Sequence, residues 1–435
     1  MSMALRKKIA VYVEQLQEHI RIPLFATAYT LIINQVLSAA LGMFYWALAA
    51  NLYSADVVGQ NSTLISTILL LGALAEFSLK AGMGRFIPRA GRYIRQLIII
   101  TYIITTLAAL IISAIFFNLG SFFGFTDNLL TDTKDLQLFL WFLPIIWTIF
   151  YVQDGVLTGL REAKWVLYEN LAYNIIKLVI LVWIFFSGSS YGLFASWFIP
   201  VPFMVIFVNW LIFARFIPRY LQGDLTQTGI TVREIALSVG GDHIGTLLAE
   251  TGIRVLPLLV LNLLGESASA YFYEAWLIGN TIYLVAYNFA SSFAVEAASN
   301  RQEIATISRN VVIQKARVIL PLAAGVFLFA HIGLNIFGAA YAREGTALLR
   351  WLAAAAVPMI LNIWYLGYAR ITGRNWGIIR NQGLTCLITL GLSYTLIGKL
   401  GITGVGIAWF SAQIVVALIV SVEFRKVVFE KQEEQ

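Results

Sequence analysis

The sequence has almost no cysteine and little charge. Cys386 is the single cysteine among 435 residues and lies in an apolar segment, so the chain has no disulfide framework. Charged residues make up 12% of the chain, whereas a soluble domain carries about a quarter. Hydrophobic residues make up 59%, and the mean hydropathy is +0.79. These values exclude an ordinary soluble protein and predict an all-α integral membrane protein.

Motifs typical of enzymes are also missing. No Gly-Lys-Ser or Gly-Lys-Thr phosphate-binding loop occurs, which excludes ATP hydrolysis by that route. No group of His, Asp and Glu has the spacing of metal ligands, and no polar region is long enough for a catalytic domain. We therefore expect neither an enzyme nor a bound cofactor. A carrier or flippase remains, driven by a coupling ion (H⁺ or Na⁺) or by downstream removal of its substrate.

Apolar segments of bilayer-spanning length, about 20 residues, recur along the whole chain. They predict twelve transmembrane helices near residues 26–50, 59–80, 96–118, 136–158, 166–187, 192–214, 233–264, 268–292, 315–337, 348–369, 379–397 and 403–424. Most Lys and Arg residues fall in alternate loops, which by the positive-inside rule places both termini in the cytoplasm. The chain is thus expected to be a multi-pass protein of the cell (cytoplasmic, or inner) membrane. Its net charge of +7 is an orientation signal, and no nucleic-acid partner is needed to explain it.

The two halves of the sequence repeat each other. Asn51, Trp165 and Asn170 recur as Asn262, Trp376 and Asn381, always at an offset of 211 residues, which indicates a duplication. Because each repeat holds six spans, the halves enter the membrane in the same orientation. This predicts two six-helix lobes related by a pseudo-two-fold axis along the membrane normal, with the substrate pathway between them. The predicted parts are an amphipathic cytoplasmic segment (1–22), an N-lobe (23–221), a cytoplasmic linker (222–231), a C-lobe (232–424) and a cytoplasmic tail (425–435).

The seventh span has the most unusual polar pattern. Asp242, Glu250 and Arg254 lie inside an apolar helix, where each charge costs roughly 2.5–3.5 kcal/mol on insertion scales. Their spacing in multiples of four puts them on one face of the helix and predicts a polar cavity wall, although Asp242 alternatively lies in the inner headgroup layer. Alternatively, Glu250 and Arg254 simply neutralise each other.

Glycine and proline weaken the same helix. They either make a bendable gate or allow close helix packing, as small residues do in membranes. The predicted gate residues are Gly240, Gly241, Gly245, Gly252 and Pro257.

Polar residues on other spans extend the predicted cavity. Asn34 and Gln35 on the first span either line it or bond to neighbouring helices. Lys177 lies at mid-depth in the fifth span, where a lysine is either functional or structurally paired. Asn280 and Tyr283 belong to an aromatic stripe on the eighth span, which either stacks on sugars or packs against other helices.

Four segments resemble a known family. They are A-N-L-Y-S-A-D-V-V-G-Q at Ala50–Gln60, L-L-G-E-S-A-S-A-Y-F-Y-E-A-W at Leu263–Trp276, Y-A-R-E-G-T-A-L-L-R at Tyr341–Arg350 and G-I-T-G-V-G-I-A-W at Gly401–Trp409. With the twelve spans, the chain resembles the polysaccharide flippases of the multidrug/oligosaccharidyl-lipid/polysaccharide exporter (MOP) superfamily. The resemblance covers nearly all of the spans.

The resemblance implies a V-shaped pair of lobes and alternating access. It implies that a polyprenyl-diphosphate-linked oligosaccharide moves from the inner to the outer leaflet, with Arg254 gripping the diphosphate through its planar fork. Glu250 is alternatively a proton or sodium coupling group. Expected partners are this lipid-linked substrate, membrane lipids and a polysaccharide polymerase or glycosyltransferases, around a monomeric transporter. Two other functions stay open: an ion-coupled exporter of drugs or other small molecules in the same superfamily, and a non-transporting scaffold for glycosyltransferases.

Overall fold

The computed structural model describes residues 23–122, 134–223, 232–299 and 304–428, which are helical with short connections. The first half forms α2 (Pro23–Leu52), α3 (Ala55–Glu76), α4 (Leu79–Phe86), α5 (Ile94–Phe122), α6 (Lys134–Gly159), α7 (Ala163–Phe185), α8 (Gly192–Phe198), α9 (Pro200–Leu211) and α10 (Ile217–Leu221). The second half forms α11 (Val232–Leu264), α12 (Glu266–Ser299), α13 (Ile304–Asn335), α14 (Ala339–Ile371), α15 (Asn375–Leu400) and α16 (Ile402–Val428). The predicted amphipathic segment 1–22 and most of the predicted linker and tail lie outside the described residues.

Each of the twelve predicted spans corresponds to a long helix or, for the sixth, to a run of short ones. Within the described ranges, eleven helical stretches are long and apolar enough to cross a membrane, and α12 is the remaining long helix. The sixth span is divided near Ile199, because Pro200 and Pro202 have no N–H for the helix ladder. A π-helical turn over Ile212–Phe216 then joins α9 to α10. The predicted all-α, multi-pass fold is confirmed.

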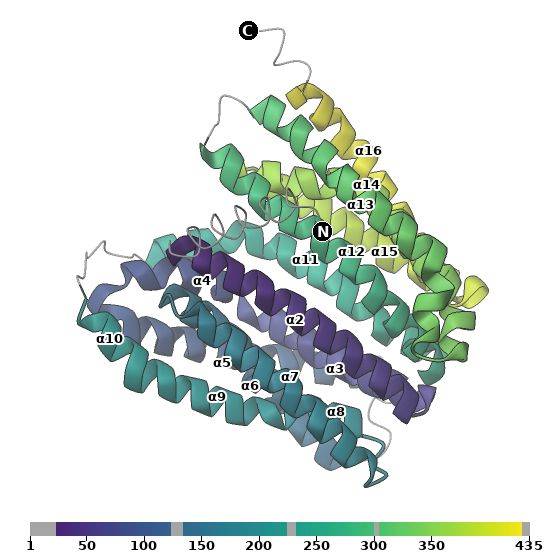
Figure 1. The fold of residues 1–435 in the computed structure, drawn as a ribbon, viewed down its shortest axis with the longest axis horizontal. Coiled ribbons are helices and arrows are strands. Elements are labelled where there is room, and N and C mark those ends of the chain that lie inside the picture. The colour runs from purple at the N-terminus through teal and green to yellow at the C-terminus, as the bar shows by residue number, and fades with distance from the viewer. Residues whose placement is uncertain (1–22, 123–133, 224–231, 300–303, 429–435) are drawn as a thin grey trace, which may run out of the picture.

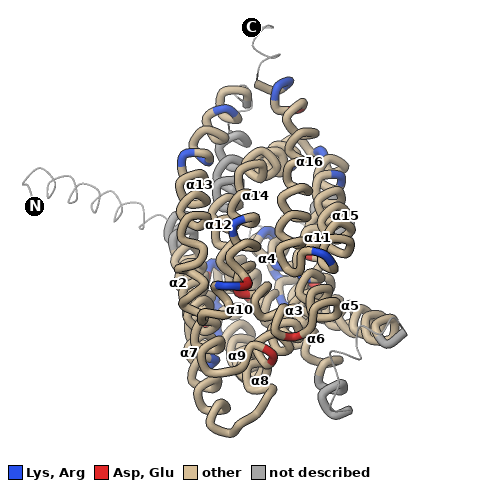
Figure 2. The backbone as a smooth tube through the Cα atoms, turned by 90° about the vertical axis from the view of Figure 1, so that its right-hand side faces the viewer, with Lys and Arg blue, Asp and Glu red and all other residues tan. Residues whose placement is uncertain are grey.

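The helices form two lobes, α2–α10 and α11–α16, arranged as a V (Figure 1). In the first lobe α3 is the most enclosed span, with 78% of its most apolar window buried. It packs against α5 and α6 of its own lobe and against α11 and α12 of the other. In the second lobe α14 is central and contacts α12, α13 and α16. Most of each helix carries no charged residue (Figure 2), as expected for surfaces that face lipid.

The lobes approach each other most closely at one end, which we call the convergent end. There the ideal Cβ position of Gly59 on α3 lies 1.8 Å from the carbonyl oxygen of Glu266 on α12. The hydroxyls of Thr63 and Ser269 form a hydrogen bond of 2.8 Å across the same interface. Two further bonds between the lobes join Ser267 to Asp56, and Asn51 to the carbonyl of Ile336. The lobes spread apart toward the opposite, divergent end, where α10 and the end of α16 lie far from each other (Figure 1).

Candidate functional site

A cavity lies between the lobes, with walls from both. It consists of two adjoining spaces of about 350 Å³ and 440 Å³ that share Glu250, Arg254, Tyr273 and Asn280. We call them together the central cavity. The aromatic side chains on its walls are Trp46, Trp147, Tyr151, Tyr173, Trp197, Tyr273, Trp276 and Tyr287. Such walls suit a molecule with a large apolar body, because aromatic rings offer flat apolar surface with polar edges.

Glu250 and Arg254 form an ion pair on the cavity wall. Arg254 Nε donates to Glu250 Oε2 at 2.5 Å. The Arg254 side chain is 31% exposed and the Glu250 side chain is 33% exposed. The alternative that Glu250 and Arg254 neutralise each other is therefore confirmed for this state. Because the pair is neutral as a unit, the Arg254 guanidinium is already occupied in this state, and an anionic ligand would compete with Glu250 for it.

The predicted gate glycines of α11 are packing contacts in this state. The ideal Cβ position of Gly245 lies 2.5 Å from Cγ2 of Ile378, and that of Gly252 lies 3.2 Å from Cα of Cys386, both on α15. α11 remains a helix through Pro257, whose carbonyl accepts a bond from Ser269. The packing alternative thus holds for these two glycines, while the gate stays a hypothesis. The side-chain surroundings of Gly240, Gly241 and Asp242 lie outside the described residues.

Lys177 reaches the central cavity from α7 through a box of aromatic rings. It is 2% exposed. Its Nζ lies 4.3 Å from the ring centroid of Trp197, 4.6 Å from that of Tyr45 and 5.2 Å from that of Tyr173. A desolvated cation–π interaction stabilises the cation by about 2 kcal/mol, whereas transferring an ammonium from water into the protein interior costs several kcal/mol. The rings therefore compensate only part of the cost of burying this charge.

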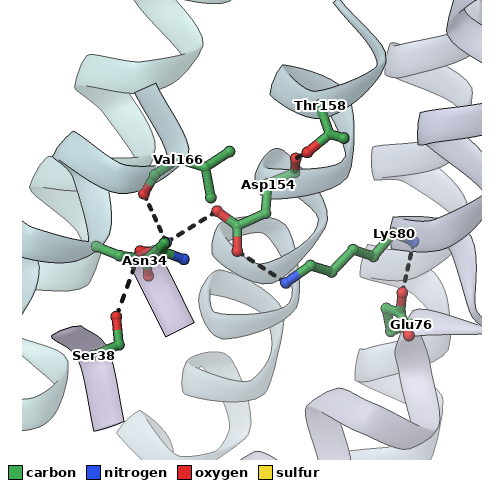
Figure 3. Close-up of polar contacts among 8 residues, drawn as sticks. Asn34, Ser38, Glu76, Lys80, Asp154, Thr158 and Val166 are labelled. Carbon is green, nitrogen blue, oxygen red and sulfur yellow. Dashed lines mark hydrogen bonds and ion pairs between the residues drawn. The ribbon is translucent and has the colours of Figure 1, made fainter. Parts of the chain in front are cut away.

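Asn34, one of the two first-span amides, lies beside a second space, which we call the vestibule. It measures about 470 Å³ and shares Glu76, Tyr151 and Thr246 with the central cavity. Asn34 lines it and accepts a hydrogen bond of 3.5 Å from Ser38 (Figure 3). Gln35 is half-buried on the same helix. The cavity prediction thus fits Asn34 at the vestibule.

The vestibule wall carries an ion pair that sequence reasoning missed. Lys80 Nζ donates to Asp154 Oδ2 at 2.9 Å, while Glu76 Oε1 accepts the Lys80 backbone N–H at 2.6 Å (Figure 3). Asp154 also accepts a bond from Asn170. Lys80 and Asp154 are 74 residues apart, so no local spacing signals the pair. The Asp154 carboxylate therefore neutralises the Lys80 ammonium, whereas Glu76 bonds to the backbone of Lys80.

The aromatic stripe on α12 divides between two environments. Asn280 lines the central cavity, as predicted. Tyr283 instead packs inside the second lobe at 2% exposure, where its hydroxyl donates to the Leu352 carbonyl and accepts from Trp409 Nε1. The assignment of Tyr283 to the cavity is therefore corrected. Its position on the helix turns it toward α14 and α16, and both hydrogen-bonding roles of its hydroxyl are already used.

Comparisons with known proteins place the fold. Neither a protein family profile nor a curated protein matches the chain. Among solved structures, an inward-facing multidrug resistance MATE family transporter of the MOP superfamily is 16% identical. The match covers 94% of this chain and 99% of that one, with a TM-score of 0.67. A second MATE structure, in a bent conformation, is 16% identical with a TM-score of 0.64, and the match covers 95% and 97% of the two chains.

A third structure is a MOP superfamily transporter from Pyrococcus furiosus, described as having a binding pocket of reverse polarity that suggests a different function. It is 15% identical, with a TM-score of 0.60 and 94% of each chain covered. At these identities the likeness is one of fold. The chain therefore has the two-lobe fold of MATE transporters over nearly its whole length.

Proposed function

We propose that the chain is an ion-coupled exporter of small amphiphilic molecules that works by alternating access. The observation that carries the proposal is the aromatic-walled cavity between two lobes that pack closely at the convergent end and spread apart toward the other, where a hydrogen bond of 3.2 Å links Ser78 to His243 (Figure 1). With the predicted orientation, the convergent end faces outward and the divergent end faces the cytoplasm, so this state accepts substrate from inside. The similar solved structures include multidrug transporters, which supports small-molecule export over other uses of the fold.

Glu250 is our candidate for the coupling group. It lies on the helix that lines the cavity, and its carboxylate is held by Arg254 alone among the bonds described for it. Glu250 lines both spaces of the cavity, so a proton or Na⁺ bound there and a substrate in the same space would exclude each other, as exchange of an entering ion for a leaving substrate requires. Ion binding and substrate binding in one space provide a direct form of coupling.

A second candidate is the flipping of a polyprenyl-diphosphate-linked oligosaccharide, which the sequence resemblance suggests. The specific observation in its favour is the cavity charge. The walls carry Lys177, Arg254 and Arg370 against Glu76 and Glu250, which is one basic residue in excess, so they favour an anionic group over a cationic one. The pocket of reverse polarity in the Pyrococcus furiosus transporter was taken to suggest a different function for that protein. Pocket polarity is the property that separates the two candidates here.

Transport by the purified chain in proteoliposomes tests both candidates. We expect a pH or Na⁺ gradient to drive an amphiphilic dye across the membrane, and an ionophore that collapses the gradient to stop it. Liposomes without protein are the control. Gradient-independent movement of a fluorescent polyprenyl-diphosphate oligosaccharide, with no movement of dyes, would overturn the exporter proposal in favour of the flippase.

A further inference from the structure

The surroundings of Lys177 are built around its charge. The hydroxyl of Tyr45 bonds to the Leu193 carbonyl at 3.1 Å and to Ser196 Oγ at 2.8 Å. The hydroxyl of Tyr173 donates to the Trp197 carbonyl at 3.1 Å. These bonds fix the rings, so their π systems, and not their hydroxyls, surround the ammonium. The box is therefore held in place before any ligand arrives.

Two other cations, one on the cavity wall and one on the vestibule wall, have carboxylate partners. Arg254 is paired with Glu250, and Lys80 is paired with Asp154. Within the described part of the chain, no such pair involves Lys177. The repeat-equivalent position in the second lobe is Ile388. The fold thus accepts an apolar residue at this place, and the charge of Lys177 is not required to build the lobe.

We propose that Lys177 binds the anionic group, a phosphate or a carboxylate, of the transported amphiphile. The apolar body of that molecule then lies against Trp46, Trp147 and Tyr273 on the same cavity wall. An ammonium is a compact point charge with three donors, so it accepts either kind of anion without demanding a planar partner. The inference rests on the proposed role of the central cavity as the transport path and narrows its substrates to anionic amphiphiles, excluding organic cations.

Equilibrium binding to the purified full chain tests this inference without any transport step. The probes are water-soluble and share one apolar body: 1-naphthyl phosphate, 1-naphthoate, 1-naphthalenemethanol and 1-naphthylmethylamine, titrated by calorimetry. We expect wild type to bind both anions at least about tenfold more tightly than the alcohol, the usual scale for a hydrogen bond to a charged group. The amine should bind most weakly. Comparing phosphate with carboxylate identifies which anion the site prefers.

Variants at Lys177 assign the effect to this side chain. Lys177→Met should lose the preference for anions, binding them about as weakly as the alcohol, and Lys177→Arg should keep it. Lys399→Met, at an exposed position of α15, is the matched control and should bind like wild type. Equal binding of 1-naphthyl phosphate by wild type and Lys177→Met would overturn the proposal. So would tighter binding of the amine by wild type, a result that needs no variant and remains decisive if a variant does not fold.

The stability of Lys177→Met gives a second, independent reading. Methionine is similar in length and removes a buried charge that the rings compensate only in part. We expect its melting temperature in detergent to equal or exceed that of wild type, whereas a structural role for the charge would lower it. Anion binding without any transport in proteoliposomes would support the Lys177 site and contradict the exporter proposal. Equal transport of neutral and anionic dyes would support the exporter proposal and contradict the role of Lys177 in selecting anions.

Discussion

Replacing Gly59 with valine is expected to hold the convergent end apart and to abolish transport. The ideal Cβ position at Gly59 lies 1.8 Å from the carbonyl oxygen of Glu266, 2.7 Å from its carbonyl carbon and 3.0 Å from the backbone nitrogen of Ala270. These are backbone atoms of α12, so no rotamer change can relieve the contact. To regain ordinary van der Waals distance, α3 and α12 must separate by roughly 1.5 Å.

The expected size of the effect follows from packing energetics. Overpacking costs about 1–3 kcal/mol even where side chains can adjust, and every 1.4 kcal/mol changes an equilibrium about tenfold. A cost of about 3 kcal/mol would thus shift the balance between the closed and open convergent ends by about a hundredfold. Each lobe keeps its own core, so the variant should still fold. A carrier that cannot close one end cannot complete its cycle.

Spin labels on the two lobes measure this shift directly. In a Cys386→Ala background, labels at exposed Ser187 and Arg343 report the distance across the convergent end. Gly59→Val should move the distance distribution outward, and uptake in proteoliposomes should fall to the level of empty liposomes. Gly391→Ala is the matched control, because its Cβ would meet nothing within 4 Å. Wild-type distances together with wild-type uptake would mean that α12 adapts to the added side chain.

The sequence predicts the spans well because a membrane imposes one strong rule. Every backbone polar group in lipid must be bonded within the helix, so long apolar segments such as α5 and α16 can be recognised as spans from the sequence alone. The ion pair of Glu250 and Arg254 was foreseeable for a similar reason: both residues belong to one helix and lie one turn apart. Local spacing is sufficient for such features.

Contacts between distant segments were not predictable in the same way. The aromatic box combines Tyr45 on α2, Tyr173 and Lys177 on α7 and Trp197 on α8, which meet only after the first lobe has assembled. The close approach at Gly59 depends on the register of α3 against α12, for which a single sequence gives no signal. Tyr283 was misassigned because a stripe on a helix does not indicate which neighbour it faces. The sequence repeat did give one usable indication of the Lys177 site. Lys177 occupies the position equivalent to Ile388 in the second half, so it departs from the pattern that the two halves share.

Replacing Glu250 with glutamine is expected to uncouple the carrier without stopping exchange. Glutamine keeps the size of the side chain and removes the carboxylate that would bind H⁺ or Na⁺. Proteoliposomes holding Glu250→Gln should exchange labelled for unlabelled substrate, yet build no substrate gradient when a pH or Na⁺ gradient is imposed. Accumulation at the wild-type level would show that the coupling ion binds elsewhere.

A double-mutant cycle separates this role from a merely structural one. Arg254→Met alone leaves the Glu250 carboxylate without its partner, and the double variant Glu250→Gln with Arg254→Met removes both charges. Breaking a buried pair costs 3–5 kcal/mol and an exposed pair contributes under about 1 kcal/mol, so a pair one-third exposed should show a coupling energy of about 1–2 kcal/mol in thermal unfolding. The same cycle at Arg343 and Glu344, whose side chains are 77% and 47% exposed, is the control and should show almost none. If the double variant regains the stability that Arg254→Met loses but not the accumulation, the charges at this site serve transport. If it regains both, the pair only holds α11 together, and the coupling group must lie elsewhere in the cavity.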